Sequence, residues 1–340
     1  MHLRLLLLAV CLAVPATARA DISLRVSVKF ILSSSGQRPV SCCGFGASSI
    51  ALTNSQAVID NIAYSNELLR RSGRGYTLQL TEIVDVSGWS GFYNLAARSS
   101  DNRSALEAVA TSNATTRAQF AWRDNAINIY INNTSSGVCS FPETGDDAIF
   151  VGSSAYDTLL IHELGHYFGL YHTHQGEQYL NTDNSGCSSA NCSCARLIGG
   201  TGDEIADTVA DHQCWSYSQM VANNPSASTT AILNTFTNIM SYHIPADRFT
   251  TLQLDRWTDY AGTSRSGVAT GVTRFVDGDD ASFIQIGLST LPFDNVPAAV
   301  NVSAPSDIVL IRAGNYGGSM TLNRATTLRA TRGAAVLGKP

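Results

Sequence analysis

Three histidines and one glutamate in this chain have the types and the spacing that could hold a metal ion and activate water. The run H-E-x-x-H-x-x-G-x-x-H begins at His162. On a helix, His162 and His166 lie one turn apart on the same face, so their imidazoles can bind one Zn²⁺. Gly169 lets the chain leave the helix sharply and return His172 as a third ligand. Three protein ligands leave one position open for water, which is the catalytic arrangement, and Glu163 can reach that water.

A helix must carry the first two histidines, and the local sequence favours one. Asp157 and Thr158 suit a helix start. They precede an apolar stripe that comprises Leu159, Leu160, Leu164 and Phe168. A short H-E-x-x-H match can be an accident of a helix surface, but the glycine and the third histidine extend it to the long form. The pattern therefore predicts a zinc-binding helix.

A second segment suggests a floor beneath the metal. The extended signature is followed downstream by a methionine turn, and residues 238–242 read N-I-M-S-Y. Met240 is expected to pack beneath the three imidazoles. Tyr242 could bring its phenol either to the metal or to the oxyanion that develops during hydrolysis. The alternative interpretation is that Met240 is an ordinary core residue and Tyr242 an ordinary surface residue.

These motifs, with three further segments, make the chain similar to the metzincin peptidases, and within them to the pappalysin (cytophagalysin) family. Thr173 follows the third histidine, where the astacin branch usually has glutamate. Residues 202–209 resemble the family's G-D-x-V-x-D-T-P, with Val209 in place of the final proline. Residues 249–256 resemble F-T-x-x-Q-x-x-R, which opens the family's last catalytic-domain helix. The resemblance covers about residues 22 to 262, and the departure at Val209 puts the shape of that loop in doubt.

Strand and helix patterns alternate ahead of the signature and predict an α+β fold, in which helices back a mixed sheet. Strands are expected at residues 24–32, 76–86, 126–131 and 148–151, and helices at 54–71 and 104–111. The resemblance implies the same twisted sheet, with residues 148–151 as the upper strand that pairs with substrate. It also implies a loop-rich lower subdomain, from about residue 169 to 260, held by the metal and by disulfides.

Three regions are predicted along the chain. Residues 1–20 have a positive start, a short apolar core and the small-x-small site Ala18-Arg19-Ala20, as in a secretory signal peptide. Residues 21–262 form the metzincin-like peptidase domain. Residues 263–340 comprise a linker and short β-like runs, at 283–286, 308–311, 314–316 and 325–337. This last region is either the start of a β-helix-like module or a small β-rich appendage, and surface or carbohydrate contact is a further hypothesis for it.

Bulk properties favour an exported protein. Beyond the signal peptide no apolar stretch is long enough to span a membrane. Charged residues make up only 14% of the chain, and the net charge of −5 gives no reason to expect nucleic-acid binding. The cysteines between the signature and the methionine turn are expected to form loop-stapling disulfides rather than a second metal site, because the compartment is oxidising. They are Cys187, Cys192, Cys194 and Cys214.

Other polar residues near the motifs receive weaker roles. His174, His212 and His243 are predicted to be loop histidines rather than ligands, because the zinc already has three. Asp203 and Asp207 could join a Ca²⁺ site, since carboxylates are suitable hard ligands, and the resemblance suggests calcium too. The same spacing equally fits a capped turn.

The resulting prediction is a secreted zinc endopeptidase that acts on proteins or peptides. Zn²⁺ would lower the pKa of a bound water and polarise the scissile carbonyl. Glu163 would take the proton of the water and deliver it to the leaving amine, and Tyr242 would stabilise the tetrahedral intermediate. The alternative is a non-catalytic binding protein that keeps a stabilising zinc site on the same fold. The retention of Glu163 argues against that alternative.

Overall fold

The structure is a computed structural model. It describes residues 21–40, 49–73, 76–139, 141–144, 147–181, 183, 186, 192–279, 285, 292–303, 307–324 and 326–338. The predicted signal peptide, the β-like run at 283–286 apart from Gln285, and Cys187 lie outside the described residues. Within the described ranges, no helix is long and apolar enough to cross a membrane.

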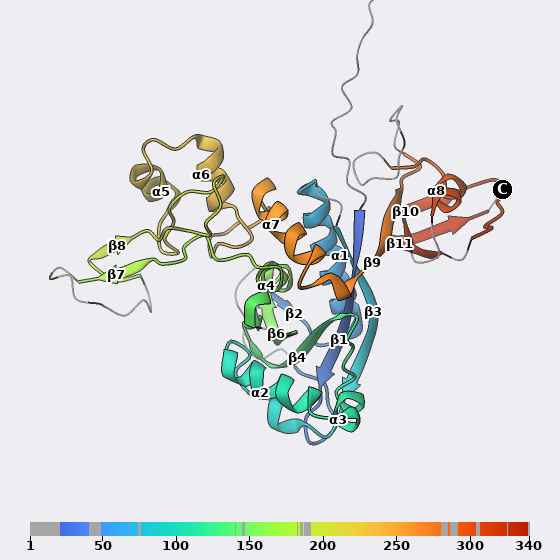
Figure 1. Cartoon of the computed structure of the whole chain (residues 1–340), viewed down its shortest axis with the longest axis horizontal. Helices are drawn as coiled ribbons and strands as arrows, with labels where there is room; N and C mark the ends of the chain where they lie inside the picture. Colours follow the sequence, from blue (N-terminus) through green and yellow to red (C-terminus); the bar gives the residue numbers. More distant parts are fainter. Residues whose placement is uncertain are drawn as a thin grey trace, which may run out of the picture.

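Four parallel strands form the centre of the main sheet (Figure 1). β1 (Asp21–Ile31) pairs along its length with β3 (Tyr76–Val86) on one side. On its other side it pairs with β4 (Ile127–Ser135), which pairs in turn with β6 (Ala148–Tyr156). All four strands were predicted from their apolar patterns, and the three antiparallel strands described below make the sheet a mixed one.

Successive side chains of these strands point to opposite faces of the sheet, as the period of two requires. On β4, Ile129 and Ile131 join one core whereas Tyr130 joins the other. α1 (Ser55–Arg71), which begins after the capping residue Asn54, packs on the first core. The three elements between β3 and β4 cover the second core. They are η1 (Ser90–Phe92), α2 (Ser100–Thr111) and α3 (Ala114–Gln119). Helices on both faces of a mixed sheet confirm the predicted α+β fold.

Two short strands lie against β6 and correct one expectation. β5 (Gly137–Cys139) pairs antiparallel with residues 149–151, and β2 (Ser49–Ala51) pairs antiparallel with residues 154–156. Residues 148–151 therefore have β4 on one side and β5 on the other. Their peptide groups are already paired, so the expectation that this segment pairs with substrate is wrong. The edge position belongs to β5.

A fully buried lysine lies within this sheet. The ammonium of Lys29, on β1, donates to Oδ1 of Asn128 at 2.5 Å and to the carbonyl of Ser27 at 3.2 Å. Burial holds its pKa well below the usual range; the nearby Glu82 opposes that shift and Arg123 adds to it. Between the folded pKa and the ordinary value near 10.5, the unfolded chain binds more protons than the native one, so stability rises with pH.

We therefore expect Lys29→Met to flatten the pH dependence of stability. From about pH 8 to 10 the free energy of unfolding of the wild type should rise more steeply than that of the variant. The variant keeps a satisfied Asn128, because the backbone N–H of Arg123 still donates to Oδ1 at 2.9 Å. Urea unfolding of both proteins across this range measures the two slopes. Equal slopes would show that Lys29 keeps its proton in the native state.

The segment after the signature helix forms a lobe beside the sheet (Figure 1). Its regular elements are β7 (Gln178–Leu180), β8 (Arg196–Ile198), α5 (Tyr217–Asn223) and α6 (Thr229–Phe236). The core is small and centres on Trp215, Met220 and Ile232. A disulfide joins Cys192 to Cys214, which confirms the predicted use of cysteines as staples for that pair. After this lobe in the sequence, α7 (Thr251–Gly262) packs on the first core.

The C-terminal strands extend the same sheet. β9 (Ala269–Val276) pairs antiparallel with residues 21–24 of β1, and β10 (Ile308–Tyr316) and β11 (Thr327–Leu337) follow it in parallel. With α8 (Val296–Val302) they enclose a separate core. A groove of about 1260 Å³ lies between this region and α1 with β3. The predicted domain boundary near residue 262 stays a prediction.

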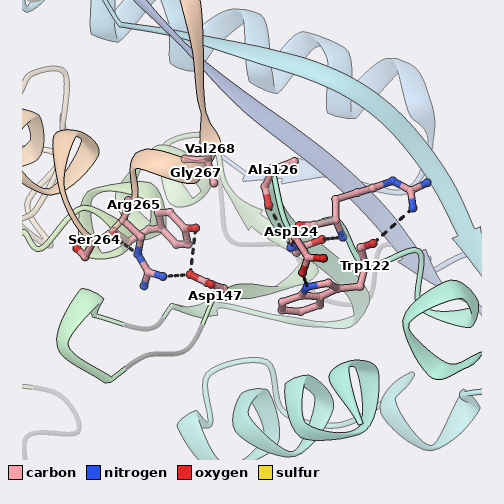
Figure 2. Close-up of a pocket in the computed structure, with 11 residues that line it drawn as sticks. Trp122, Asp124, Ala126, Asp147, Ser264, Arg265, Gly267 and Val268 are labelled. Atoms are coloured by element: carbon pink, nitrogen blue, oxygen red, sulfur yellow. Dashed lines mark hydrogen bonds and ion pairs between the residues drawn. The ribbon is translucent and has the colours of Figure 1, made fainter. Parts of the chain in front are cut away.

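The stretch expected to be a linker packs against the peptidase-like region through Arg265. Arg265 lies just before η3 (Ser266–Val268) and is 4% exposed. Its guanidinium pairs with Asp147 and lies over the ring of Tyr167, 4.1 Å from its centroid (Figure 2). The Nε–H donates to the carbonyl of Tyr167 at 3.3 Å. The adjoining cavity holds about 80 Å³, far below the roughly 300–1,000 Å³ of ligand sites, so it is a packing feature.

Candidate active site

The signature helix is short and almost wholly buried. α4 (Leu159–Tyr167) packs Leu160, Ile161 and Leu164 into the first core, which leaves the two histidines on the remaining face. Thr158 occupies the N-cap position but makes no side-chain capping hydrogen bond. The helix ends where the sequence places its glycine. Gly169 has φ +78°, and the N–H of Leu170 reaches back to the carbonyl of Gly165 at 2.9 Å.

This turn brings the three imidazoles together. Nε2 of His172 lies 3.1 Å from Nε2 of His162 and 3.0 Å from Nε2 of His166. A tetrahedral Zn²⁺ with Zn–N bonds of about 2.0–2.1 Å separates its ligand nitrogens by about 3.3 Å, so the set fits zinc after a shift of a few tenths of an ångström. In the part of the chain that the structure describes, no other trio of metal-ligating groups lies so close.

Two of the histidines are oriented by backbone carbonyls. Nδ1–H of His162 donates to the carbonyl of Ile239 at 2.6 Å, and Nδ1–H of His166 donates to that of Leu170 at 2.7 Å. Both bonds leave Nε2 with a free lone pair directed at the common point. Burial lowers the pKa of His162 to about 4 and that of His166 to about 3, and it lowers the pKa of His172 as well. Neutral imidazoles are the form that a metal requires.

Glu163 is buried next to these ligands. The residue is only 4% exposed, and this burial raises the pKa of its carboxyl to about 8. The edge strand β5 lies directly against it. A Cβ built on Gly137 would lie 2.9 Å from Oε1 of Glu163 and 3.1 Å from its Cγ. The absence of a side chain at Gly137 therefore creates the space that the carboxylate occupies, a role that sequence reasoning missed.

The methionine turn packs against the same helix from below. Met240 is fully buried, and a Cβ on Gly165 would lie 2.3 Å from its sulfur. The turn also contacts the ligands through its backbone, because Ile239 accepts from His162 and Met240 accepts from the N–H of Thr173 at 3.1 Å. Gly165 was not singled out from the sequence, although a glycine inside a buried helix is itself a signal of close packing.

Tyr242 lies beside the histidines and is 54% exposed. Its ring centroid is 5.9 Å from that of His162 and 5.0 Å from that of His172. Partial burial raises the pKa of the phenol, and the nearby Glu163 adds to the shift, so the hydroxyl keeps its proton at neutral pH. Phe141, which no sequence signal marked, lies on the other side with its ring 5.1 Å from that of His166.

The segments that carried the family resemblance meet in one buried network. Gln253, from residues 249–256, donates to Oδ2 of Asp203 at 2.6 Å and accepts from Asn238 at 2.9 Å. Oδ1 of Asn238 accepts from the N–H of Met240 at 2.8 Å. The methionine turn thus rests on the G-D loop and on α7. Val209 fits as well, because its N–H donates to Thr235 at 2.8 Å, which a proline could not do.

Polar residues near the site have their own partners. His243 pairs with Asp211 at 2.8 Å, and His212 lies 3.4 Å from Glu177. Oδ1 of Asp203 accepts from Ile205 at 3.2 Å and from the hydroxyl of Thr208 at 2.6 Å. These bonds match the capped-turn interpretation for Asp203, and the predicted Ca²⁺ site stays a prediction.

Comparison with known proteins places the site in a family. Residues 113–261 match the family model described as pregnancy-associated plasma protein-A, of the M43 peptidases. Mirolysin in complex with compound 9 is 18% identical, with TM-score 0.44, and the match covers 74% of this chain and 96% of that one. Tannerella forsythia mature mirolysin in complex with a cleaved peptide is 17% identical, with TM-score 0.45 and the same coverage. No curated protein matches the chain.

The family match bears directly on the histidine cluster. It spans α4, the G-D loop, the methionine turn and α7, so it includes every segment on which the sequence resemblance rested. The predicted resemblance is thereby confirmed. Residues 113–261 are similar to the metallopeptidases of the pappalysin family of metzincins, and the three clustered histidines fit a metal site of that kind.

Proposed function

We propose that the chain is a secreted endopeptidase in which His162, His166 and His172 hold one catalytic Zn²⁺. The supporting observation is that the ligand nitrogens of the three histidines lie within 4.8 Å of one another, with Nε2 of His172 3.1 Å from that of His162 and 3.0 Å from that of His166. Glu163, which directly follows the first of these histidines in sequence, is buried as well. The bound ion would supply Lewis acidity toward the scissile carbonyl and a lowered pKa for its water. Proton transfer and stabilisation of the oxyanion are assigned to the side chains of Glu163 and Tyr242.

Glu163 acts as the proton carrier in this proposal. It accepts a proton from the attacking water as the C–O bond forms, and it delivers that proton to the amine nitrogen as the C–N bond breaks. Its raised pKa suits both transfers, because a group that titrates near neutral pH can take and release a proton. Tyr242 is exposed beside the histidines and keeps its hydroxyl proton, so it can donate a hydrogen bond to the carbonyl oxygen as negative charge develops.

The edge strand β5 is the proposed docking strand for the substrate backbone. Its inner side pairs with β6, and no other described strand pairs with its outer side. Gly137 on this strand faces Glu163, so a peptide aligned beside β5 passes the proton carrier. Main-chain pairing of this kind recognises an extended peptide with little dependence on its sequence.

Export is proposed on two grounds. The first twenty residues have the pattern of a secretory signal peptide. The Cys192–Cys214 disulfide suits an oxidising compartment. The C-terminal strands offer no observation for carbohydrate contact, so that hypothesis stays untested. The non-catalytic alternative is disfavoured, because the general base and the full ligand set are all present in one family-matched segment.

The proposal predicts chelator-sensitive proteolysis. The purified mature chain should degrade unfolded casein or gelatin, lose that activity after zinc chelation and dialysis, and recover it on addition of about one equivalent of Zn²⁺. The reason is that the ion supplies both the nucleophile and the Lewis acid. The two readouts are the cleavage of fluorescence-labelled casein and the zinc content measured by atomic absorption. Undiminished cleavage by protein shown to be free of zinc would contradict the proposal.

A further inference from the structure

The third histidine of the cluster is held differently from the other two. His162 and His166 each donate from Nδ1 to a backbone carbonyl. Within the part of the chain that the structure describes, no such bond is found for His172. Ligand orientation normally depends on contacts behind the ligand, and their loss weakens a metal site. Something other than a carbonyl must therefore fix the plane of this ring.

Two aromatic rings take that place. The imidazole of His174 lies nearly parallel to that of His172, with an interplanar angle of 11° and 4.7 Å between centroids. The ring of Tyr242 lies edge-on to His172, at 67° and 5.0 Å. Tyr242 also contacts His174 itself, 4.6 Å between centroids. Offset parallel and edge-to-face pairs at these separations are favourable arrangements.

The backbone between the two histidines is rigidly placed, which makes the stack specific. Thr173 is fully buried, and its N–H donates to the carbonyl of Met240 at 3.1 Å. Its hydroxyl donates to Oδ2 of Asp211 at 2.6 Å. Asp211 also accepts from the N–H of His212 at 2.7 Å and pairs with His243 at 2.8 Å. This buried network fixes the backbone that carries the rings of His172 and His174.

A histidine at position 174 costs stability, and the orientation of its ring is the benefit that offsets this cost. The residue is 6% exposed, and its Nδ1 is buried with no hydrogen-bond partner in the described part of the chain. A buried polar atom without a partner lowers stability. His174 does not belong to the group of histidines that could share one ion. The feature that remains is a flat ring stacked on the third ligand.

We propose that His174 is a positioning residue for the metal centre, because its ring fixes the orientation of the His172 imidazole as the two carbonyls fix the other ligands. The inference rests on the proposed zinc site. Its ligand is Zn²⁺ itself, and the prediction concerns affinity for that ion. Any flat, non-ionising ring at position 174 serves the purpose, whereas an aliphatic side chain of similar volume does not.

A matched pair of variants tests this. His174→Phe keeps a flat ring and removes the unpaired nitrogen, whereas His174→Leu fills the space without a ring. We expect the Kd for Zn²⁺, measured by competition with a chromophoric chelator, to stay near the wild-type value in His174→Phe. In His174→Leu it should rise by about 10–100-fold. At saturating Zn²⁺ the KM of a peptide substrate should be unchanged in both, because position 174 acts through the ligand.

His212→Phe is the control, because this buried histidine packs edge-on against Tyr179 in the same lobe but contacts none of the three ligands. It should bind Zn²⁺ as the wild type does. Equal affinity of wild type and His174→Leu would overturn the inference, as would equal weakening in both position-174 variants or a similar loss in His212→Phe. Absence of zinc binding by the wild type itself would instead defeat the proposed function.

Discussion

Replacing Glu163 by glutamine is expected to lower kcat by about 10²–10⁴-fold while the protein still binds one zinc ion. Glutamine has nearly the same shape as glutamate, so it fits the space beside Gly137 without a new contact. It cannot accept and then release a proton, however, and the attacking water loses its base. The loss should therefore appear in kcat, with KM and zinc content close to those of the wild type. Steady-state cleavage of a quenched fluorescent peptide measures the split.

The control for this variant is the zinc stoichiometry of the same preparation. A zinc-free Glu163→Gln protein would give no information about proton transfer, since the ion is needed as well. A fully loaded variant with wild-type kcat would show that another group carries the proton, and Tyr242 would then be the next residue to replace because it is exposed beside the histidines.

The second large effect is expected from Gly137→Ala on the edge strand. The new methyl group would lie 2.9 Å from Oε1 of Glu163, closer than real Cβ atoms approach, and 3.1 Å from Cγ1 of Val151, which is a tight contact. Val151 is packed in the core and cannot retreat, so the carboxylate has to move. A displacement that approaches 1 Å at a reacting group can cost about 10²-fold, and we expect kcat to fall by about 10–100-fold.

Gly91→Ala is the matched control, because a Cβ at Gly91 would meet nothing within 4 Å. It should keep wild-type kinetics. The change at Gly137 acts through Glu163, so it should add little to a chain that already carries Glu163→Gln. A Gly137→Ala protein with normal kcat would mean that the carboxylate has room to move without loss. Full additivity of the two changes would mean that Gly137 acts on the substrate instead.

Local spacing predicted the ligands, but tertiary contacts decided the rest of the site. His162 and His166 share a face because of helix geometry, and Gly169 permits the turn that returns His172; both follow from a run of eleven residues. The close contacts of Gly137 and Gly165 depend on segments far along the chain. Gly165 faces Met240, 75 positions away in sequence, and no local pattern reports such an approach.

The strands show the same division. The apolar alternation of β1, β3, β4 and β6 predicted that these strands exist and roughly where they begin. Pairing order was not contained in that pattern. Residues 148–151 read as a strand at any position in a sheet, and only the return of β5 against β6 shows that they are interior. Likewise, nothing in residues 269–276 indicates that they pair with β1.

That last pairing has a consequence for how the molecule is assembled in time. β1 shares one side between β4 and β9, and the hydroxyls of Ser23 and Thr273 share a buried hydrogen bond across 250 positions of sequence. Contacts so distant along the chain form only after a large loop has closed. The entropy lost in closing that loop slows folding. During synthesis the first part of β1 must therefore wait, with one edge open, until β9 has emerged from the ribosome.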